Sequence, residues 1–176
     1  MGRKILTYDI LLTILLIFSR TLSLNRRVSI MKRGNMEPTI ENLQLLTSEF
    51  FQKHWNEQYL CEKHPNWSDV YRFKGSVPNH DKQGVYAFVK EEIVTYIGVG
   101  TSQGSGKYTG HGIGKRFQAY TKVVNDAHTP ADPRLIDAGA MITIGFNKSH
   151  AYLANALELF LIGRLNTEHN ANRPGS

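Results

Sequence analysis

The sequence predicts an α/β protein of the α+β class, in which a small sheet is flanked by helices. Two strand-like runs, residues 84–91 and 93–100, follow one another across a tight polar turn. A third strand-like run covers residues 140–146, and helical patterns stand before, between and after the three runs. Together these observations place the strands in the C-terminal half of the chain, with helices around them.

The first two strand-like runs are expected to pair as a β-hairpin. Their sequences, GVYAFVKE and IVTYIGVG, are rich in β-branched and aromatic residues, which suit a half-buried pleated surface. Lys90, Glu91 and Glu92 supply the polar turn between them. The third run, AMITIGF, has a similar composition and is expected to be a strand.

Three helices are predicted from apolar residues spaced three and four positions apart. They cover residues 39–55, 113–124 and 149–165, with Thr39 and Ser149 as N-caps of the first and the last. The last helix repeats leucine every four residues, at Leu153, Leu157, Leu161 and Leu165. This repeat predicts a stripe that packs into the core.

The remaining segments lack a clear period. Residues 56–83 are expected to contain loop and short elements, residues 125–134 are expected to be loop, and residues 100–112 form a glycine-rich loop. The expected parts of the chain are an apolar and basic N-terminal segment (1–35), a helical and loop extension (36–83) and the main domain (84–176).

The net charge of +6 does not by itself indicate nucleic-acid binding. Residues 1–35 hold seven of the 21 basic residues and one of the 15 acidic residues, which leaves 14 of each in residues 36–176. A nucleic-acid argument must therefore rest on local clustering. The single cysteine, Cys61, excludes an internal disulfide framework and fits a reducing, cytoplasmic compartment.

The apolar run at residues 10–19 is too short to cross a bilayer as a helix, which needs about 20 residues. No small-residue cleavage site of a signal peptide follows it. The segment is either an uncleaved anchor or sequence upstream of a true start at Met31 or Met36. The second interpretation is favoured, because the balanced charge and the candidate chemistry both begin after it, and a membrane partner is not expected.

The glycine-rich loop matches no nucleotide-binding motif. A P-loop requires a glycine five residues before its Gly-Lys pair, and Thr101 and Thr109 occupy those positions. The third glycine of a dinucleotide fingerprint is replaced by Gln103. Structural zinc is not indicated either, because Cys61 and His64 lack a second pair of ligands.

Another constellation is spread over the predicted strands and helices. It consists of Tyr86, Tyr96, Arg116, Tyr120, Glu158 and Asn170. Taken singly, each has an ordinary explanation as a packing or surface residue, although Glu158 stands beside the predicted core stripe. Residues 99–125 contain no acid but four basic residues, Lys107, Lys115, Arg116 and Lys122. Such a segment can face phosphates, and a solvated basic face explains the charge equally well.

The order of these residues resembles the GIY-YIG nuclease family. Gly84-Val85-Tyr86 stands where the first tripeptide would be, with valine for isoleucine, and Tyr96-Ile97-Gly98 matches the second tripeptide. The chain departs from compact members at Val99, where the excision-repair branch often has lysine. It also departs in the length of the glycine-rich loop.

The downstream elements of the family are also matched in order. The stretch GIGKRFQAY resembles its first helix, with Arg116 at the arginine and Tyr120 at the position of a tyrosine or histidine. The stretch LELFLIGRL resembles the helix with the family's glutamate, at Glu158, and Asn170 matches the terminal asparagine. The resemblance covers about half of the chain.

The resemblance implies a three-stranded antiparallel sheet flanked by helices, and a metal-dependent endonuclease that hydrolyses phosphodiester bonds in DNA, with RNA not excluded. It implies that Glu158 holds Mg²⁺ or Mn²⁺, hard cations that suit a carboxylate and water ligands. Tyr86 would act as general base or as relay for the attacking water. A free tyrosine has a pKa near 10, so nearby cations would have to lower the pKa of Tyr86 for it to ionise.

The other matched residues would support the same reaction. The resemblance implies that Arg116 clamps the scissile phosphate, that Tyr96 and Tyr120 position water or phosphate, and that Asn170 braces the site by hydrogen bonding. Target recognition would come from residues 36–83, from the glycine-rich loop, or from a targeting partner, a second copy of the chain included. Repair, restriction, mobile-element and toxin-like roles all stay open.

A different class of function is compatible with the same scaffold. A non-catalytic nucleic-acid-binding module would use the fold and the basic segment without hydrolysis. The complete set of tyrosines, arginine, glutamate and asparagine argues against it, because binding alone does not require a metal carboxylate. Metal-independent binding without cleavage would favour this alternative.

Overall fold

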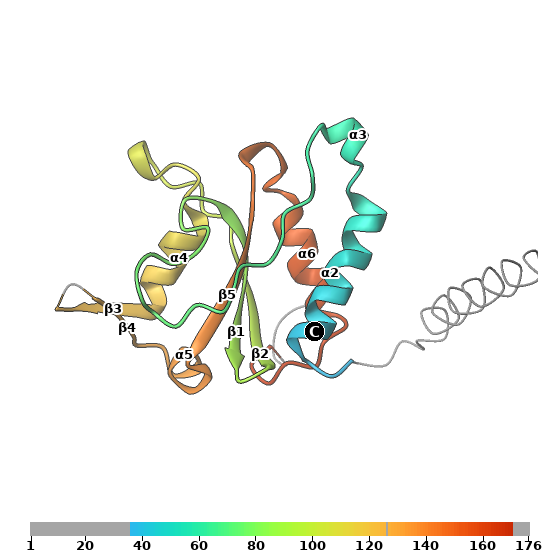
Figure 1. Ribbon diagram of the computed structural model, residues 1–176. Helices are drawn as coiled ribbons and strands as arrows, with labels where there is room; N and C mark the ends of the chain where they lie inside the picture. The colour runs from blue at the N-terminus through green and yellow to red at the C-terminus, as the bar shows by residue number, and fades with distance from the viewer. Residues whose placement is uncertain (1–35, 126, 171–176) are drawn as a thin grey trace, which may run out of the picture. The chain divides into compact units, whose positions relative to one another are not determined.

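The computed structural model describes residues 36–125 and 127–170 (Figure 1). The N-terminal segment predicted as an anchor or an upstream sequence, residues 1–35, lies outside the described residues. Within the part of the chain that is described, no helix combines the length and the hydropathy needed to cross a bilayer.

Three antiparallel strands form the main sheet. They are β1 (Gln83–Lys90), β2 (Ile93–Gly100) and β5 (Ala140–Phe146), in the order β2-β1-β5. The first strand in sequence is therefore the central one, and it pairs with both neighbours along its length. The predicted hairpin and the predicted third strand are confirmed, as is the mixed α/β class with a three-stranded antiparallel sheet and helices.

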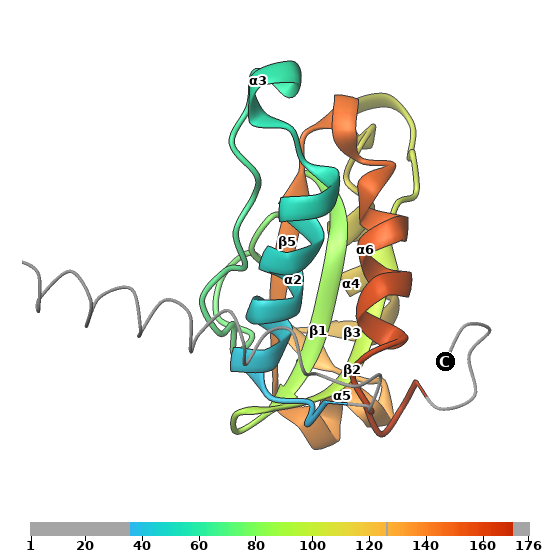
Figure 2. The ribbon, with the colours of Figure 1, turned by 90° about the vertical axis from the view of Figure 1, so that its right-hand side faces the viewer.

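Two helices cover one face of this sheet. They are α2 (Ile40–His54) and α6 (Leu153–Ile162), which lie side by side (Figure 2). Thr39 caps α2 as predicted, because its hydroxyl accepts a hydrogen bond from the amide of Asn42 at 3.1 Å. The predicted leucine stripe of the last helix is buried in this layer, at Leu153, Leu157, Leu161 and Leu165.

The opposite face of the sheet is covered by α4 (Gly112–Tyr120) and α5 (Pro133–Ala138). The core on this side is rich in aromatic side chains and includes Tyr71, Tyr86, Phe88, Tyr96, Phe117 and Tyr120. The sheet thus separates a mainly aliphatic layer from a mainly aromatic one. The candidate site residues of the strands belong to the aromatic layer.

Both edges of the sheet are covered by irregular chain. Beside β5, the amides of Ser68 and Tyr71 donate to the carbonyls of Thr143 and Met141, both at 2.8 Å. Beside β2, the segment around Asn170 takes the same role. Covered edges leave no row of free backbone groups to pair with another chain, so the sheet is complete at three strands.

The second predicted helix is too long, and this prediction is wrong at its C-terminal end. The helix ends at Tyr120, and β3 (Thr121–Val124) pairs with β4 (Ala127–Pro130) in a two-stranded hairpin. Residues 125–134, predicted as loop, thus contain a strand and the start of α5. The β-branched side chains of β3 favour an extended backbone, and Asn125 accepts the positive φ of 49° that a tight turn requires.

Two further boundaries differ from the prediction. Ser149 does not cap the last helix: it lies in a 3-10 turn, Lys148–His150, and α6 begins only at Leu153. The helix α5 was not predicted, although Asp132 caps it through the amide of Arg134 and Gly139 ends it with a φ of 74°. Residues 56–83 contain one short helix, α3 (Glu57–Leu60), and are otherwise irregular, as expected.

The packing of α2 gives a test of the fold. Leu43 is fully buried against the sheet, whereas Leu45 on the same helix is 49% exposed. We expect Leu43→Ala to lower the free energy of unfolding by roughly 2–5 kcal/mol, because it leaves a cavity. The same change at Leu45 should cost less than about 0.5 kcal/mol. Urea denaturation followed by circular dichroism measures both, and equal losses would contradict this packing.

Candidate functional site

The centre of the candidate site is Tyr86, which lies in the middle of the central strand. It stands opposite Gly98 of β2 and Thr143 of β5. The phenol lies over Gly98, and a Cβ added there would come within 2.5 Å of the Tyr86 Cζ. Because that distance is far inside van der Waals contact, only glycine at position 98 leaves room for the ring.

Three tyrosines from three elements meet at this point. The hydroxyl oxygens of Tyr86 and Tyr120 are 2.8 Å apart and share a hydrogen bond. The ring of Tyr96 lies 6.1 Å from that of Tyr86 between centroids. All three side chains are buried. The structure therefore brings together the three predicted tyrosines, which come from β1, β2 and α4.

Arg116 joins this cluster from α4. It lies one helical turn before Tyr120, and its guanidinium carbon is 5.9 Å from the centroid of that ring. Its side chain is exposed, whereas the ring of Tyr120 is buried. The cluster therefore has a positive charge on its solvent side.

The surroundings of Tyr86 keep its hydroxyl protonated. Burial raises the pKa of Tyr86 most, the neighbouring Tyr120 and Tyr96 raise it further, and Arg116 only partly opposes this. A phenol whose pKa lies above its ordinary value is neutral throughout the physiological pH range. These surroundings therefore disfavour an ionised phenol at Tyr86.

A second arginine, which sequence reasoning missed, lies beside the same cluster. The guanidinium carbon of Arg134 lies 4.7 Å from the ring centroid of Tyr96 and 5.5 Å from that of Tyr120. Asp132 holds it through two hydrogen bonds, 2.9 Å from Nε and 2.8 Å from Nη2. The bond from Arg134 is the main reason that the pKa of Asp132 lies below its ordinary value. The Asp-Pro start of α5 was the available signal for this helix.

Glu158 belongs to the other layer, on α6, and is 8% exposed as its place beside the leucine stripe predicted. One turn earlier, Asn155 accepts a hydrogen bond from Thr101, just past the end of β2. The chain after α6 returns along β2, since the amide of His169 donates to Thr95. Glu158 follows Asn155 by one helical turn on the same helix.

Asn170 lies at the outer edge of β2. Its Oδ1 accepts a hydrogen bond from the amide of Ile97, and its Nδ2 donates to the carbonyl of Ile97, both at 2.8 Å. The hydroxyl of Thr167 donates to the same Oδ1 at 2.6 Å. The side-chain amide of Asn170 thus makes the hydrogen bonds that a neighbouring strand would make to Ile97, the residue between Tyr96 and Gly98. Its geometry is that of a brace.

The four basic residues of segment 99–125 lie in different surroundings. Lys107, Lys115 and Lys122 are exposed, whereas Arg116 lies beside the ring of Tyr120 in the tyrosine cluster. Lys107 lies over the ring of Tyr108, and Lys122 stands on β3. The predicted nucleic-acid-binding residues therefore do not form one patch at the tyrosines.

One group of three side chains with metal-ligand spacing occurs among the residues described here. It consists of Asp137, Glu168 and His169, whose ligand atoms lie within 4.8 Å of one another. The Asp137 carboxylate already pairs with Lys90 at 2.7 Å. This group does not include Glu158, so it is a separate feature from the predicted metal ligand.

Comparisons with protein-family models, with curated proteins and with solved structures found no match to this chain. The family resemblance therefore stays a hypothesis, and the site must be judged by its geometry.

The brace formed by Asn170 can be tested by stability. We expect Asn170→Ala to lower the free energy of unfolding by about 3 kcal/mol, because it removes three buried hydrogen bonds. The control Asn166→Ala alters an exposed side chain of the same segment and should change stability by less than about 0.5 kcal/mol. Equal urea midpoints for the two variants would show that the brace is unimportant.

Proposed function

We propose that this protein is a metal-dependent endonuclease of the GIY-YIG type, which hydrolyses phosphodiester bonds in DNA. The observation that carries the proposal is the convergence of Tyr86, Tyr120 and Arg116 over Gly98. Motif order alone singles out these residues, yet the two tyrosines share a 2.8 Å hydrogen bond and the guanidinium carbon of Arg116 lies 5.9 Å from the ring centroid of Tyr120. A central first strand in a three-stranded antiparallel sheet also agrees with the scaffold that the resemblance implies.

The two arginines at the edge of the tyrosine cluster have the chemistry to bind a phosphodiester. Arg116 is exposed on α4, and Arg134 stands over the rings of Tyr96 and Tyr120. Guanidinium groups bind phosphate oxygens in a bidentate manner and stay charged at all relevant pH values. Two such groups can stabilise the negative charge that develops at phosphorus during hydrolysis. Arg116 is proposed to hold the scissile phosphate and Arg134 to support it.

The paired hydroxyls suit a proton relay. A neutral hydroxyl accepts one proton as it releases its own, so the Tyr86–Tyr120 pair can move a proton away from an attacking water without forming a free phenolate. Gly98 leaves the space in which the Tyr86 hydroxyl lies. The proposed relay therefore depends on the close approach of Tyr86 to Gly98, the glycine of the second tripeptide.

The predicted metal ligand has suitable chemistry. Glu158 on α6 offers carboxylate oxygens and is 8% exposed, and Mg²⁺ is commonly held by one or two carboxylates together with waters and substrate phosphates. When bound, such a cation lowers the pKa of a coordinated water and neutralises phosphate charge. Glu158 would hold it, while Arg116 and the tyrosines orient the phosphate and the water.

One observation favours the non-catalytic alternative. The group of three metal-ligating side chains found in the described residues lies at Asp137, Glu168 and His169 and does not include Glu158. A binding module that retains the scaffold would show this arrangement too. Cleavage, and its dependence on a metal, therefore decides between the two functions.

The decisive experiment removes the proposed ligand with little change in shape. We expect Glu158→Gln to reduce nicking of plasmid DNA and cleavage of branched DNA by about 100-fold or more in Mg²⁺ or Mn²⁺. The matched control is Glu41→Gln on the exposed side of α2, which should cut like the wild type. Chelation by EDTA should abolish cleavage by both the wild type and the control.

Three outcomes of this experiment would count against the nuclease. Cleavage by Glu158→Gln at the wild-type rate would remove Glu158 from the mechanism, and undiminished activity in EDTA would remove the metal. Binding of DNA without cleavage by the wild type on every substrate would favour the non-catalytic module. Thermal melting of each variant shows whether lost activity reflects lost folding.

The newly found arginine gives an independent prediction. We expect Arg134→Ala to lower the cleavage rate by about tenfold to 100-fold, and Arg134→Lys to rescue it poorly, because lysine lacks the planar fork that Asp132 holds. The control Arg72→Ala removes an exposed arginine outside the cluster. Wild-type kinetics for Arg134→Ala would limit Arg134 to packing.

A further inference from the structure

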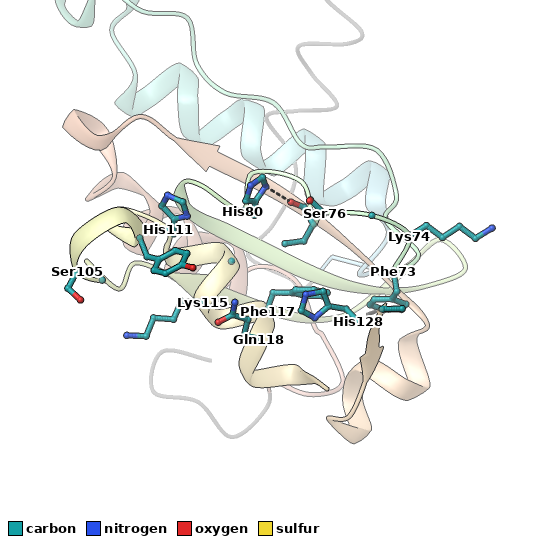
Figure 3. Close-up of a pocket in the computed structure, with 16 residues that line it drawn as sticks. Phe73, Lys74, Ser76, His80, Ser105, His111, Lys115, Phe117, Gln118 and His128 are labelled. Carbon is teal, nitrogen blue, oxygen red and sulfur yellow. Dashed lines mark hydrogen bonds between the residues drawn. The ribbon is translucent and has the colours of Figure 1, made fainter. Parts of the chain in front are cut away.

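A groove of about 920 Å³ opens beside α4 (Figure 3). Four segments line it: residues 73–80 before the central strand, the glycine-rich loop, α4 and β4. None of the residues proposed for catalysis lines this groove, so it is a separate site on the same layer of the protein.

Different faces of α4 contribute residues to the groove and to the tyrosine cluster. His111, Gly114, Lys115 and Gln118 line the groove and recur at the three- and four-residue spacing of one helical face. Arg116 belongs to the tyrosine cluster instead. A ligand in the groove would therefore lie one helix width or less from the candidate active site.

Among the residues that the structure describes, the lining of the groove is basic and contains no acid. Its cationic and imidazole side chains are Lys74, His80, His111, Lys115 and His128. Figure 3 shows Lys74 and Lys115 toward opposite ends of the groove, with His80 and His111 along one side. This charge distribution favours a ligand with more than one negative group, spaced along its length.

The other side of the groove is aromatic. The rings of Phe73 and Phe117 lie parallel, at an interplanar angle of 8° and 6.4 Å between centroids, and the ring of His128 is 5.0 Å from Phe117. Tyr108 adds a ring from the glycine-rich loop that is 57% exposed. Phe117 itself is buried and supports the ring of Phe73 from the core side, whereas Phe73, His128 and Tyr108 are at least partly exposed. Exposed flat rings are platforms on which nucleobases stack.

The backbone at Phe73 supports a specific role for this wall. Its φ is +62°, in the left-handed region that a bulky side chain rarely adopts. Contacts with Tyr71 and Phe117 hold the ring at the groove in spite of this conformation. Such backbone outliers concentrate at binding and catalytic sites.

We propose that this groove binds an unpaired stretch of nucleic acid, with its bases against the aromatic side and its phosphates near Lys74 and Lys115. A duplex hides its base faces in the stack, whereas an unpaired strand exposes both bases and phosphates. A single nucleotide has the same chemistry but cannot place phosphates at both ends of the groove. The inference rests on the proposed function in taking nucleic acid as the ligand, and it names the unpaired strand as the part recognised.

The test measures binding apart from cleavage. Fluorescence anisotropy of a labelled oligodeoxythymidylate is recorded with the full chain in EDTA, and the same strand paired as a duplex and free thymidine monophosphate are compared. Binding in EDTA does not require hydrolysis, so failure of this inference and failure of the nuclease mechanism are distinguishable. Increasing salt should weaken strand binding.

Matched variants separate the groove from general surface charge. We expect the double change Lys74→Ala with Lys115→Ala to weaken strand binding by about tenfold. The control pair, Lys63→Ala with Lys148→Ala, removes the same charge from exposed positions outside the groove and should change binding by less than about twofold.

The aromatic side is tested in the same way. We expect Tyr108→Ala to weaken strand binding by about tenfold, the effect of losing one stacked base. Tyr59→Ala, at a tyrosine that is 84% exposed on α3, should have no effect. The inference would be overturned if the Lys74 and Lys115 double variant bound the strand with wild-type affinity. It would also be overturned if the duplex bound as tightly as the strand or more tightly, or if thymidine monophosphate bound as tightly as the strand.

Discussion

The hydroxyl end of Tyr86 occupies the space that a side chain at Gly98 would take, and the candidate site depends on this contact. The strand register places the two residues opposite each other, and a Cβ at position 98 would overlap the phenol. With the ring in place, its oxygen lies 2.8 Å from that of Tyr120, whose ring is also beside Arg116. The two tripeptide matches thus describe one physical unit, a phenol packed on a glycine across a hairpin.

The helix α4 connects the tyrosine cluster with the groove beside it. Its inward side supplies Tyr120 to the cluster, and the neighbouring face supplies Lys115 and His111 to the groove. Because both faces belong to one short rigid element, a strand seated in the groove and a phosphate held by Arg116 would have a fixed spacing. Proposed binding and proposed catalysis are thereby coupled without a moving part.

The three strands of the main sheet could be predicted from the sequence, because β-branched and aromatic runs separated by polar turns are local signals. The family resemblance also named the three tyrosines that lie together in the structure. The sequence pattern misassigned Thr121–Val124, where an apolar period continued past the end of a helix. Arg134 was missed for a different reason: its place beside Tyr96 is a tertiary contact between α5 and β2 that no local pattern encodes.

The protonation of Tyr86 decides how such a site could act. Burial and two neighbouring phenols raise the pKa of Tyr86, and Arg116 does not reverse the effect. A phenolate base would have to be formed against this environment, whereas a neutral hydroxyl pair can transfer a proton without separating charge in the core. The arginines are then free to act on the phosphate, where negative charge grows during hydrolysis. Under the proposed function, proton transfer would therefore fall to the buried hydroxyls and charge stabilisation to the two arginines.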